Sequence, residues 1–282
     1  MSAGEVEGQR GSRILGGADA RYAAIATLST VVVLGVLATA VVTSAGWPTV
    51  KEKFFNGAEF RFWFSDVAHA FVTNIQLFLI AEVLILIWAL TIAVIRNLPG
   101  PVFFPLRAMA VIYTDVFRGI PTILVVYLLG FGVPALGLSG VPTSERFWGT
   151  VALVLVYSAY VAEVYRAGID SVHPSQEAAA RSLGLSRWQS LRHVILPQAV
   201  RRVVPPLLND FIGLQKDTAL LSVIGVVEVF RQAELGTSAD FNYTPLVIAA
   251  VLFIAITIPQ ARFTDWLIAR DRRKQLAGRA GG

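Results

Sequence analysis

The residues in this sequence with the most chemical potential are charged side chains that fall within long apolar runs. Lys216 and Asp217 are adjacent in one such run, and Arg118 and Glu163 lie toward the ends of two others. A charged group at membrane depth costs about 2.5–3.5 kcal/mol on insertion scales, so it needs a partner or a water-filled path. These residues therefore predict either a route for a polar solute or charge pairs that pin neighbouring helices.

Two of these residues also have a local structural explanation. Glu163 and Arg166 are three residues apart, so they face each other on one side of a helix and can form an ion pair. Arg118 can extend to the membrane interface or pair with Asp115. The spacing alone leaves both the structural and the substrate-binding interpretations open.

The sequence gives little support to catalysis or to a bound cofactor. It contains no cysteine, and its three histidines, His69, His173 and His193, are too scattered to suggest a metal site. It also lacks the Gly-x-x-x-x-Gly-Lys-Ser/Thr loop that cradles nucleotide phosphates. We therefore predict no catalytic residues, no metal, no cofactor and no ATP site on this chain.

The elements that carry these charges are long apolar segments. Of the 282 residues, 55% are hydrophobic and 15% are charged, whereas soluble domains carry about 25% charged residues. Because backbone polar groups need internal partners in lipid, and the runs lack the alternation of barrel strands, the segments are predicted to be membrane helices. The six candidate spans are 22–46, 70–95, 108–132, 147–167, 204–229 and 245–261. The first is longer than a signal-peptide core and is predicted to remain as an anchor.

The distribution of Lys and Arg predicts the orientation in the membrane. With a cytoplasmic N-terminus, eighteen basic residues fall on the cytoplasmic side, five on the outer side and one, Lys216, within a span. Such an excess is the usual sign of cytoplasmic loops. The net charge of +5 is therefore explained by topology, and we predict a lipid bilayer rather than a nucleic acid as the partner of this basic chain. Both termini are predicted to be cytoplasmic.

The cytoplasmic segment between the fourth and fifth spans has the pattern of two short helices. Pro174 suits the first position of a helix that then runs over an alanine-rich stretch, and Gly184 suits its left-handed C-terminal cap. Ser186 and Gln189 have the spacing of a capping box for a second helix, which is predicted to end at Pro197. Such a hairpin either docks on a cytoplasmic partner or packs on its own membrane helices.

This segment resembles the EAA loop of permeases from ATP-binding-cassette (ABC) importers. The positions of that motif fall, in order, on Ala178, Ala179, Ala180, Gly184, Val194, Leu196 and Pro197. The acidic residue of the motif is displaced by one position, to Glu177, and Val194 occupies the place of its isoleucine. The resemblance implies that this loop fits a cleft on a cytoplasmic ATPase subunit and transmits its closure to the membrane helices.

Three further stretches resemble the polar-amino-acid branch of these permeases. Residues Phe117–Pro121 are similar to its Phe-Arg-Gly-Thr-Pro signature, Ala159–Ile169 to the span that leads into its EAA loop, and Lys216–Gly225 to its Lys-Asp-Thr-Ser-Leu segment. The resemblance runs from about Val67 to the C-terminus. It implies that the first span is an addition to the core of the family.

Taken with the residues, the resemblance predicts an all-α membrane protein of about six spans with a cytoplasmic coupling-helix loop. It implies a permease subunit of a polar-amino-acid ABC importer in a bacterial cytoplasmic membrane, a transport subunit and not an enzyme. The implied partners are an ATPase subunit, a second permease that is identical or homologous, and an extracytoplasmic amino-acid-binding protein. The expected organisation is a cytoplasmic tail, an extra helix with an outer loop, a permease domain with its coupling loop at 171–197, and a basic tail, at 1–21, 22–66, 67–269 and 270–282.

Two other functions remain open from the residues alone. One is a stand-alone secondary transporter or channel in which Lys216 and Asp217 couple an ion. The other is a membrane-embedded enzyme. Inverted-repeat transporters show two similar sets of spans, and the sequence shows no duplicated half, which favours a path completed by a second subunit.

Overall fold

The computed structural model of the chain describes residues 3–280, with side chains for 21–270 and for residue 273. Every regular element in the described chain is a helix, which confirms the all-α prediction. The chain divides into two units, one ending at Asn56 and the other beginning at Gly57. Each unit is described separately below.

The first unit consists of α1 (Ala3–Val42) and α2 (Trp47–Phe54). The helix of α1 begins well before the apolar run, so the segment predicted as an N-terminal tail is helical over the residues that the structure describes. Over 21–42, α1 is apolar on all sides and its side chains are exposed within the unit. A helix without a polar face is typical of a membrane span.

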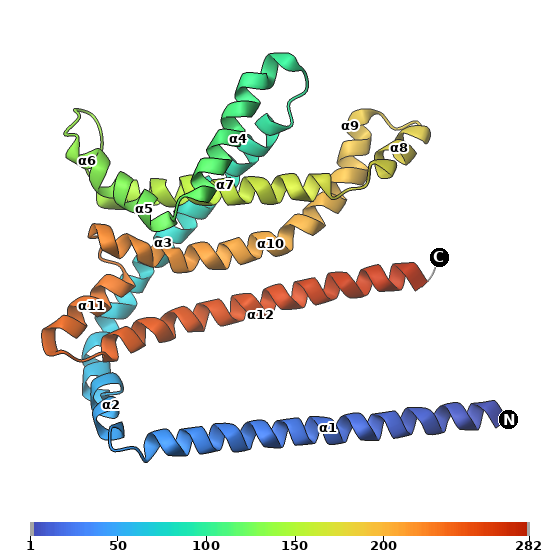
Figure 1. The fold of residues 1–282 in the computed structure, drawn as a ribbon. Helices are drawn as coiled ribbons and strands as arrows, with labels where there is room; N and C mark the ends of the chain where they lie inside the picture. Colours follow the sequence, from blue (N-terminus) through green and yellow to red (C-terminus); the bar gives the residue numbers. More distant parts are fainter. Residues whose placement is uncertain (1–2, 281–282) are drawn as a thin grey trace. The chain divides into compact units, whose positions relative to one another are not determined.

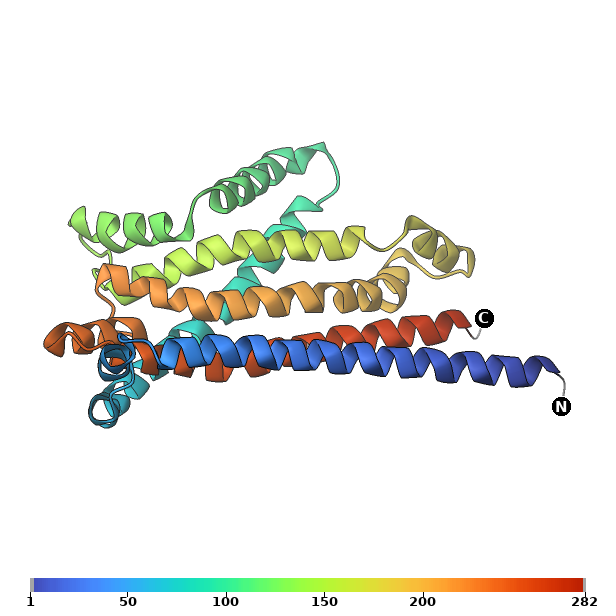
Figure 2. The same cartoon turned by 60° about the horizontal axis from the view of Figure 1, so that its bottom comes forward.

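Four long helices form the body of the second unit: α3 (Gly57–Arg96), α7 (Glu145–Asp170), α10 (Leu196–Asp217) and α12 (Thr244–Ala280). The helices α7, α10 and α12 run side by side, and α3 crosses them and contacts all three (Figures 1 and 2). Ile85, Leu153 and Leu214 are fully buried where α3, α7 and α10 meet. A second cluster, around Val67, Val229 and Ile248, joins α3 to α12 and to the short helix α11 (Val229–Asp240).

The third predicted span is a bent pair of helical segments. Its elements are η1 (Pro101–Phe103), α4 (Phe104–Gly119), α5 (Thr122–Tyr127), η2 (Leu128–Gly132) and α6 (Val133–Ala135). The two halves meet at an angle of 104° between Gly119 and Thr122. The bend follows from Pro121, because the residue before a proline is driven out of the helical region. Ile120 accordingly has φ −96° and ψ 132°.

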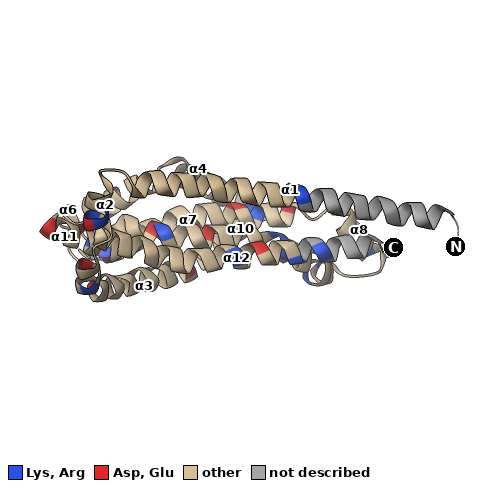
Figure 3. Ribbon diagram, turned by 90° about the horizontal axis from the view of Figure 1, so that it is seen from below, with Lys and Arg blue, Asp and Glu red and all other residues tan. Residues whose placement is uncertain are grey.

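The shorter elements lie at the two ends of the second unit (Figure 1). The hairpin of α8 (Pro174–Ser182) and α9 (Arg187–Ser190) lies at the same end as the C-terminal part of α12. We call this the hairpin end. The opposite end, called the far end, carries α6 and α11 (Val229–Asp240). Ribbon segments coloured blue for Lys and Arg mark the part of α12 near the hairpin, whereas most of α3 is uncharged (Figure 3).

Five of the six predicted spans correspond to helices long and apolar enough to cross a membrane, when the bent pair is counted as one span. The predicted span at 204–229 does not meet this test within the described residues. Its chain forms α10, which begins earlier, at Leu196, and continues as the 3₁₀ helix η4 (Thr218–Ile224). Polar residues along α10 lower its hydropathy, and the chain turns at Gly225, where φ is +94°. The count of six spans therefore stays a prediction.

Candidate functional site

The α8–α9 hairpin is built by local hydrogen bonds that its sequence specifies. The Leu185 amide donates to the Ala180 carbonyl at 3.2 Å and the Gly184 amide to the Arg181 carbonyl at 3.0 Å. These two bonds form a Schellman motif, which closes a helix through a residue of positive φ. Gly184 has φ +85°, as the sequence predicts, because glycine adopts this conformation without a steric penalty.

The second turn of the hairpin begins with the predicted capping box. The Gln189 amide donates to Ser186 Oγ at 3.2 Å, and the Ser186 amide donates to Gln189 Oε1 at 2.8 Å. The prediction that this helix ends at Pro197 is wrong. Instead, α9 continues through a π-helical turn, η3 (Leu191–Ile195), into α10. Pro197 lies in the first turn of α10, where its missing N–H would have no partner in any case.

The hairpin presents apolar and small side chains on its surface. Leu183 is 83% exposed and Trp188 is 67% exposed, so two large apolar side chains lie on the surface of this short hairpin. Of the alanines in the EAA-like stretch, Ala178 and Ala179 are exposed and Ala180 is buried. Among the other residues predicted to take part in coupling, Glu177 is half-buried and Leu196 and Pro197 are exposed. The exposed surface is therefore one that a partner can cover.

A second group of polar residues follows one face of α7. Tyr157, Tyr160 and Glu163 recur at every third residue, which places them on neighbouring turns of the helix. Tyr157 donates its hydroxyl proton to Asp217 Oδ2 at 2.9 Å, so α7 is linked to the end of α10. Lys216, next to Asp217, is exposed and has no hydrogen bond or ion pair among the described residues. The two adjacent charges thus have different surroundings, because neighbouring residues of a helix do not face each other.

Glu163 is the centre of an ion-pair cluster at the hairpin end. It pairs with Arg166 one turn later in α7, at 2.8 Å, and with Arg96 at the end of α3. Arg118 of α4 lies 4.0 Å away from the same carboxylate. Arg166 also pairs with Asp170 at 2.6 Å. The local Glu163–Arg166 pair was expected from spacing, but the bond from Arg96 is between residues 67 apart and could not be read from the sequence.

Arg118 lies beside Tyr160, and the structure shows no ion pair between it and Asp115. Its guanidinium carbon is 5.9 Å from the centre of the Tyr160 ring, within the range of a cation–π contact. The Tyr160 hydroxyl donates to the Arg118 carbonyl at 3.3 Å. Because Arg118 immediately precedes the bend between α4 and α5, these contacts tie the bent segment to α7.

A buried group of polar side chains joins α3 to the start of α11, and the sequence analysis did not predict it. Asn74 of α3 and Glu228, the N-cap of α11, are both fully buried. The Asn74 side-chain amide donates to Glu228 Oε2 at 2.9 Å and to Thr218 Oγ1 at 3.0 Å, and its oxygen accepts from the Val229 amide at 2.9 Å. Such bonds between polar side chains of different helices are common in membrane proteins. The role of Glu228 was not predicted, because only the fold brings it to α3.

Two further carboxylates lie within the helical body. Asp210 of α10 has a buried oxygen, Oδ2, without a hydrogen-bond partner in the described structure. Glu82 of α3 is close enough to Asp210 for their charges to interact. No group of three His, Cys, Asp or Glu side chains that could hold a metal is found in the described part of the chain.

The predicted site residues thus fall into two separate groups. The residues with EAA-loop positions lie on the hairpin and, for Leu196 and Pro197, in the first turn of α10. Lys216, Asp217, Arg118 and Glu163 lie along α4, α7 and α10. Glu163 lies on the column of polar residues of α7, and Asp217 of α10 is bonded to Tyr157 of that column. The two groups are linked along the chain, since α7 is joined to α8 by residues 171–173 and α9 continues through η3 into α10.

Comparison with known proteins identifies the family. Residues 100–273 match the family described as "Binding-protein-dependent transport system inner membrane component", and the chain belongs to it. The chain is 37% identical over 171 residues to "Probable glutamine ABC transporter permease protein GlnM" of Bacillus subtilis (strain 168), covering 60% of this chain and 77% of that protein. It is 33% identical over 205 residues to "Glutamate/aspartate import permease protein GltK" of Escherichia coli O6:H1, covering 71% and 90%.

Solved structures agree with this assignment. A chain from the "Crystal structure of an amino acid ABC transporter with histidines" superposes with a TM-score of 0.65 and is 32% identical, covering 72% of this chain and 93% of that one. A chain of the MetNI methionine ABC transporter has a TM-score of 0.52 at 18% identity, which shows a shared fold alone. The family assignment, with the apolar helices, makes the chain a multi-pass membrane protein.

Proposed function

We propose that this chain is the permease subunit of an ATP-driven ABC importer for polar amino acids in a bacterial cytoplasmic membrane. In this proposal it forms part of the translocation path and couples to a cytoplasmic ATPase, and it works with a second, identical or homologous permease and an extracytoplasmic binding protein. The names of its relatives, which refer to glutamine and to glutamate and aspartate, support this substrate class. The permease domain proposed here is 67–269.

The observation that carries the proposal is the α8–α9 hairpin. Its shape is fixed by the Schellman motif and the capping box, yet its large apolar side chains, Leu183 and Trp188, are exposed. Because α7 leads into the hairpin and α10 follows from it, a force applied there reaches both helices that hold the polar residues. A stand-alone transporter has no use for such a rigid exposed element, which favours the importer over the ion-coupled alternative.

The polar residues along α7 and α10 are the proposed lining of the path. Lys216 is exposed and without an ion pair in the described structure, and Asp217 has a single hydrogen bond, from Tyr157. An amino acid carries both an ammonium and a carboxylate group, so charges of both signs in one place suit it. Arg118 and Glu163 lie nearer the hairpin end and are proposed to face the same path.

The experiment that tests the proposal is the substitution Gly184→Val. A side chain with φ +85° is strained by about 1–2 kcal/mol, and β-branched residues are the least tolerant of it. We expect the membrane helices to fold while ATPase copurification is lost, or while ATP hydrolysis is no longer stimulated by the loaded binding protein. Uptake in proteoliposomes should fall at least tenfold.

Gly57→Val is the matched control. A side chain at Gly57 also meets no atom within 4 Å, but its φ is not in the left-handed region. This variant should retain the ATPase and normal uptake. Full coupling in a well-folded Gly184→Val protein would show that the hairpin does not transmit ATPase closure, and a chain that never copurifies with an ATPase would favour the stand-alone transporter.

A further inference from the structure

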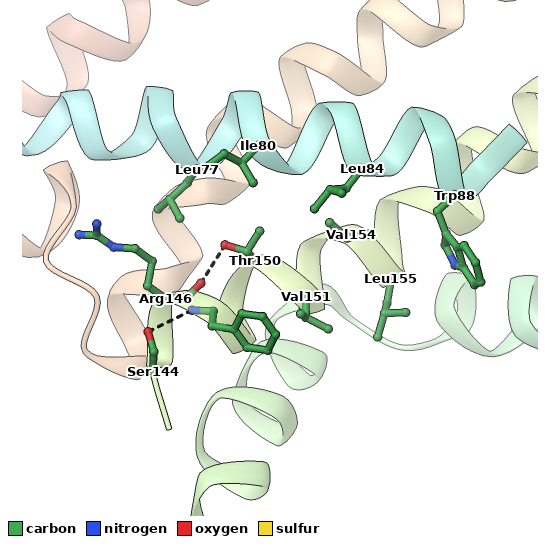
Figure 4. A pocket seen from close by; sticks show the side chains of 11 residues that line it. Leu77, Ile80, Leu84, Trp88, Ser144, Arg146, Thr150, Val151, Val154 and Leu155 are labelled. Carbon is green, nitrogen blue, oxygen red and sulfur yellow. Dashed lines mark hydrogen bonds between the residues drawn. The ribbon is translucent and has the colours of Figure 1, made fainter. Parts of the chain in front are cut away.

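An apolar groove runs between α3 and α7 on the surface of the second unit (Figure 4). Its volume is about 530 Å³, within the range of pockets that enclose small ligands. Eight of its lining side chains are large and apolar: Leu77, Ile80, Leu84 and Trp88 on α3, and Phe147, Val151, Val154 and Leu155 on α7. Ile80, Leu84 and Trp88 are 56%, 45% and 44% exposed, so the packing of the unit leaves this slot open.

The groove is polar only at one end. Ser144 and Thr150 line that end, but their hydroxyls already take part in local bonds, Ser144 Oγ accepting from the Phe147 amide and Thr150 Oγ1 donating to the Arg146 carbonyl. Figure 4 shows the Arg146 side chain at the same end and Trp88 at the other. The Arg146 guanidinium is exposed and has no ion pair among the described residues. The adjacent Glu145 points to another side of the helix.

The length of the groove corresponds to one leaflet of a bilayer. Arg146 and Leu155 are nine residues apart on α7, which is about 14 Å along a helix axis. The hydrocarbon core of a bilayer is about 30 Å thick. Because α7 starts at the far end of the unit, the groove extends from that membrane surface to near the middle of the bilayer.

We propose that this groove is a binding site for one phospholipid of the leaflet at the far end, with an acyl chain between α3 and α7 and the phosphate on Arg146. The apolar walls match the chain, and the single cation at the rim matches the charge of the head group. A protein partner would need complementary side chains along the whole slot, whereas an acyl chain adapts to its irregular walls. Bound lipid would fill the space between α3 and α7, and α7 is one of the two helices to which the hairpin is proposed to transmit movement.

The test uses the full-length chain, purified in detergent with the subunits that it retains. It is titrated with phosphatidylglycerol, and bound lipid is counted by native mass spectrometry. We expect one molecule per permease chain to survive detergent exchange. Arg146→Gln should weaken binding about fivefold, the effect of one basic residue near an anionic surface. Leu84→Trp fills the groove and should abolish the retained lipid.

Val83→Trp is the control for the added tryptophan. Val83 is 58% exposed on the same helix and does not line the groove. Equal lipid retention in the wild-type chain, Arg146→Gln and Leu84→Trp would overturn the proposal. If Leu84→Trp does not fold, Arg146→Gln, an exposed substitution, decides the result.

A second measurement tests whether another copy of the chain, and not a lipid, occupies the groove. The protein has no cysteine, so Val151→Cys introduces a single thiol inside the groove. Lipid in the groove predicts that these thiols do not cross-link two permease chains in membranes. Efficient cross-linking through Val151→Cys would show that the groove is an interface between chains and would overturn the lipid assignment.

Discussion

Two polar clusters adjoin each other in the sequence between Lys216 and Arg231, and they differ in how completely their polar atoms are paired. In the junction of Asn74 and Glu228, both side chains are fully buried and every carboxylate oxygen accepts a hydrogen bond. Glu228 alone accepts from the Asn74 amide and from the backbone amides of Phe230 and Arg231, at 2.9–3.0 Å.

The cluster of Lys216 and Asp217 is much less completely paired. Asp217 accepts one bond from Tyr157, and Lys216 has no bonded partner in the described part of the chain. A buried polar group without a partner costs about 1–3 kcal/mol, and the Glu228 junction avoids this cost by its complete pairing. Lys216 is exposed and Asp217 is only half-buried, so in the proposed path these two charges would be available to a solute.

The junction also positions the pair. Thr218 follows Asp217 directly and accepts from the Asn74 amide at 3.0 Å, while its own hydroxyl donates to the Gln215 carbonyl at 2.7 Å. The start of η4 is thereby fixed to α3. A rigid, fully paired cluster next to an incompletely paired one is the arrangement expected of a binding site and its support.

The largest expected effect comes from breaking the junction with Glu228→Ala. The substitution removes one of the two acceptors of the buried Asn74 amide and the acceptors of two part-buried backbone amides, those of Phe230 and Arg231. An unpaired buried polar group costs about 1–3 kcal/mol, so we expect a total loss of stability of about 3 kcal/mol or more. The measurement is the melting temperature of the purified protein and its monodisperse fraction on size exclusion.

Glu234→Ala is the matched control on the same helix. Glu234 is 46% exposed and pairs with the exposed Arg231 at 2.6 Å. Surface pairs of this kind contribute about 0–1 kcal/mol, so this variant should melt close to the wild type. If Glu228→Ala melts no lower than Glu234→Ala, the junction is not a structural support and the comparison fails.

A smaller effect on stability, with a large effect on transport, is expected from Lys216→Gln and Asp217→Asn. Asparagine can still accept the Tyr157 hydroxyl, so Asp217→Asn should change stability by less than about 1 kcal/mol. If the charges contact the solute, uptake in proteoliposomes should fall about tenfold or more, while the ATPase still copurifies. A melting temperature as low as that of Glu228→Ala, or unchanged uptake in both variants, would show that the pair is structural.

The α8–α9 hairpin and the polar clusters differ in how far their structure can be predicted from the sequence. The hairpin is specified by neighbours: Pro174, Gly184, Ser186 and Gln189 form a helix start, a left-handed cap and a capping box within sixteen residues. The sequence therefore predicts it almost completely. Only the predicted end of its second helix was wrong. Pro197 fits the first turn of α10, so it does not terminate the helix there.

The polar clusters depend on contacts between distant residues. Asn74 and Glu228 are 154 residues apart, and Tyr157 and Asp217 are 60 apart. The sequence shows that a polar residue in an apolar run needs a partner, but only the packing of α3 against α11 and of α7 against α10 decides which. The pairing of Arg96 with Glu163 was missed for the same reason.

The smallest effect, and the sharpest test of the comparison, is expected from Tyr157→Phe. The change removes one hydroxyl and leaves the ring in place, so the stability lost is that of a single hydrogen bond, about 1 kcal/mol. Tyr160→Phe is its control, since the Tyr160 hydroxyl donates to a backbone carbonyl, at 3.3 Å, and not to Asp217.

Two outcomes distinguish the roles of Asp217. If water or solute reaches Asp217, that molecule replaces the lost hydrogen bond, and Tyr157→Phe should alter the KM for uptake several-fold while its melting temperature stays close to that of Tyr160→Phe. If Asp217 is instead buried with Tyr157 as its only partner, the isolated carboxylate destabilises the fold, and Tyr157→Phe should melt well below Tyr160→Phe. That second result would place Asp217 in the same structural class as Glu228 and remove the distinction between the two clusters.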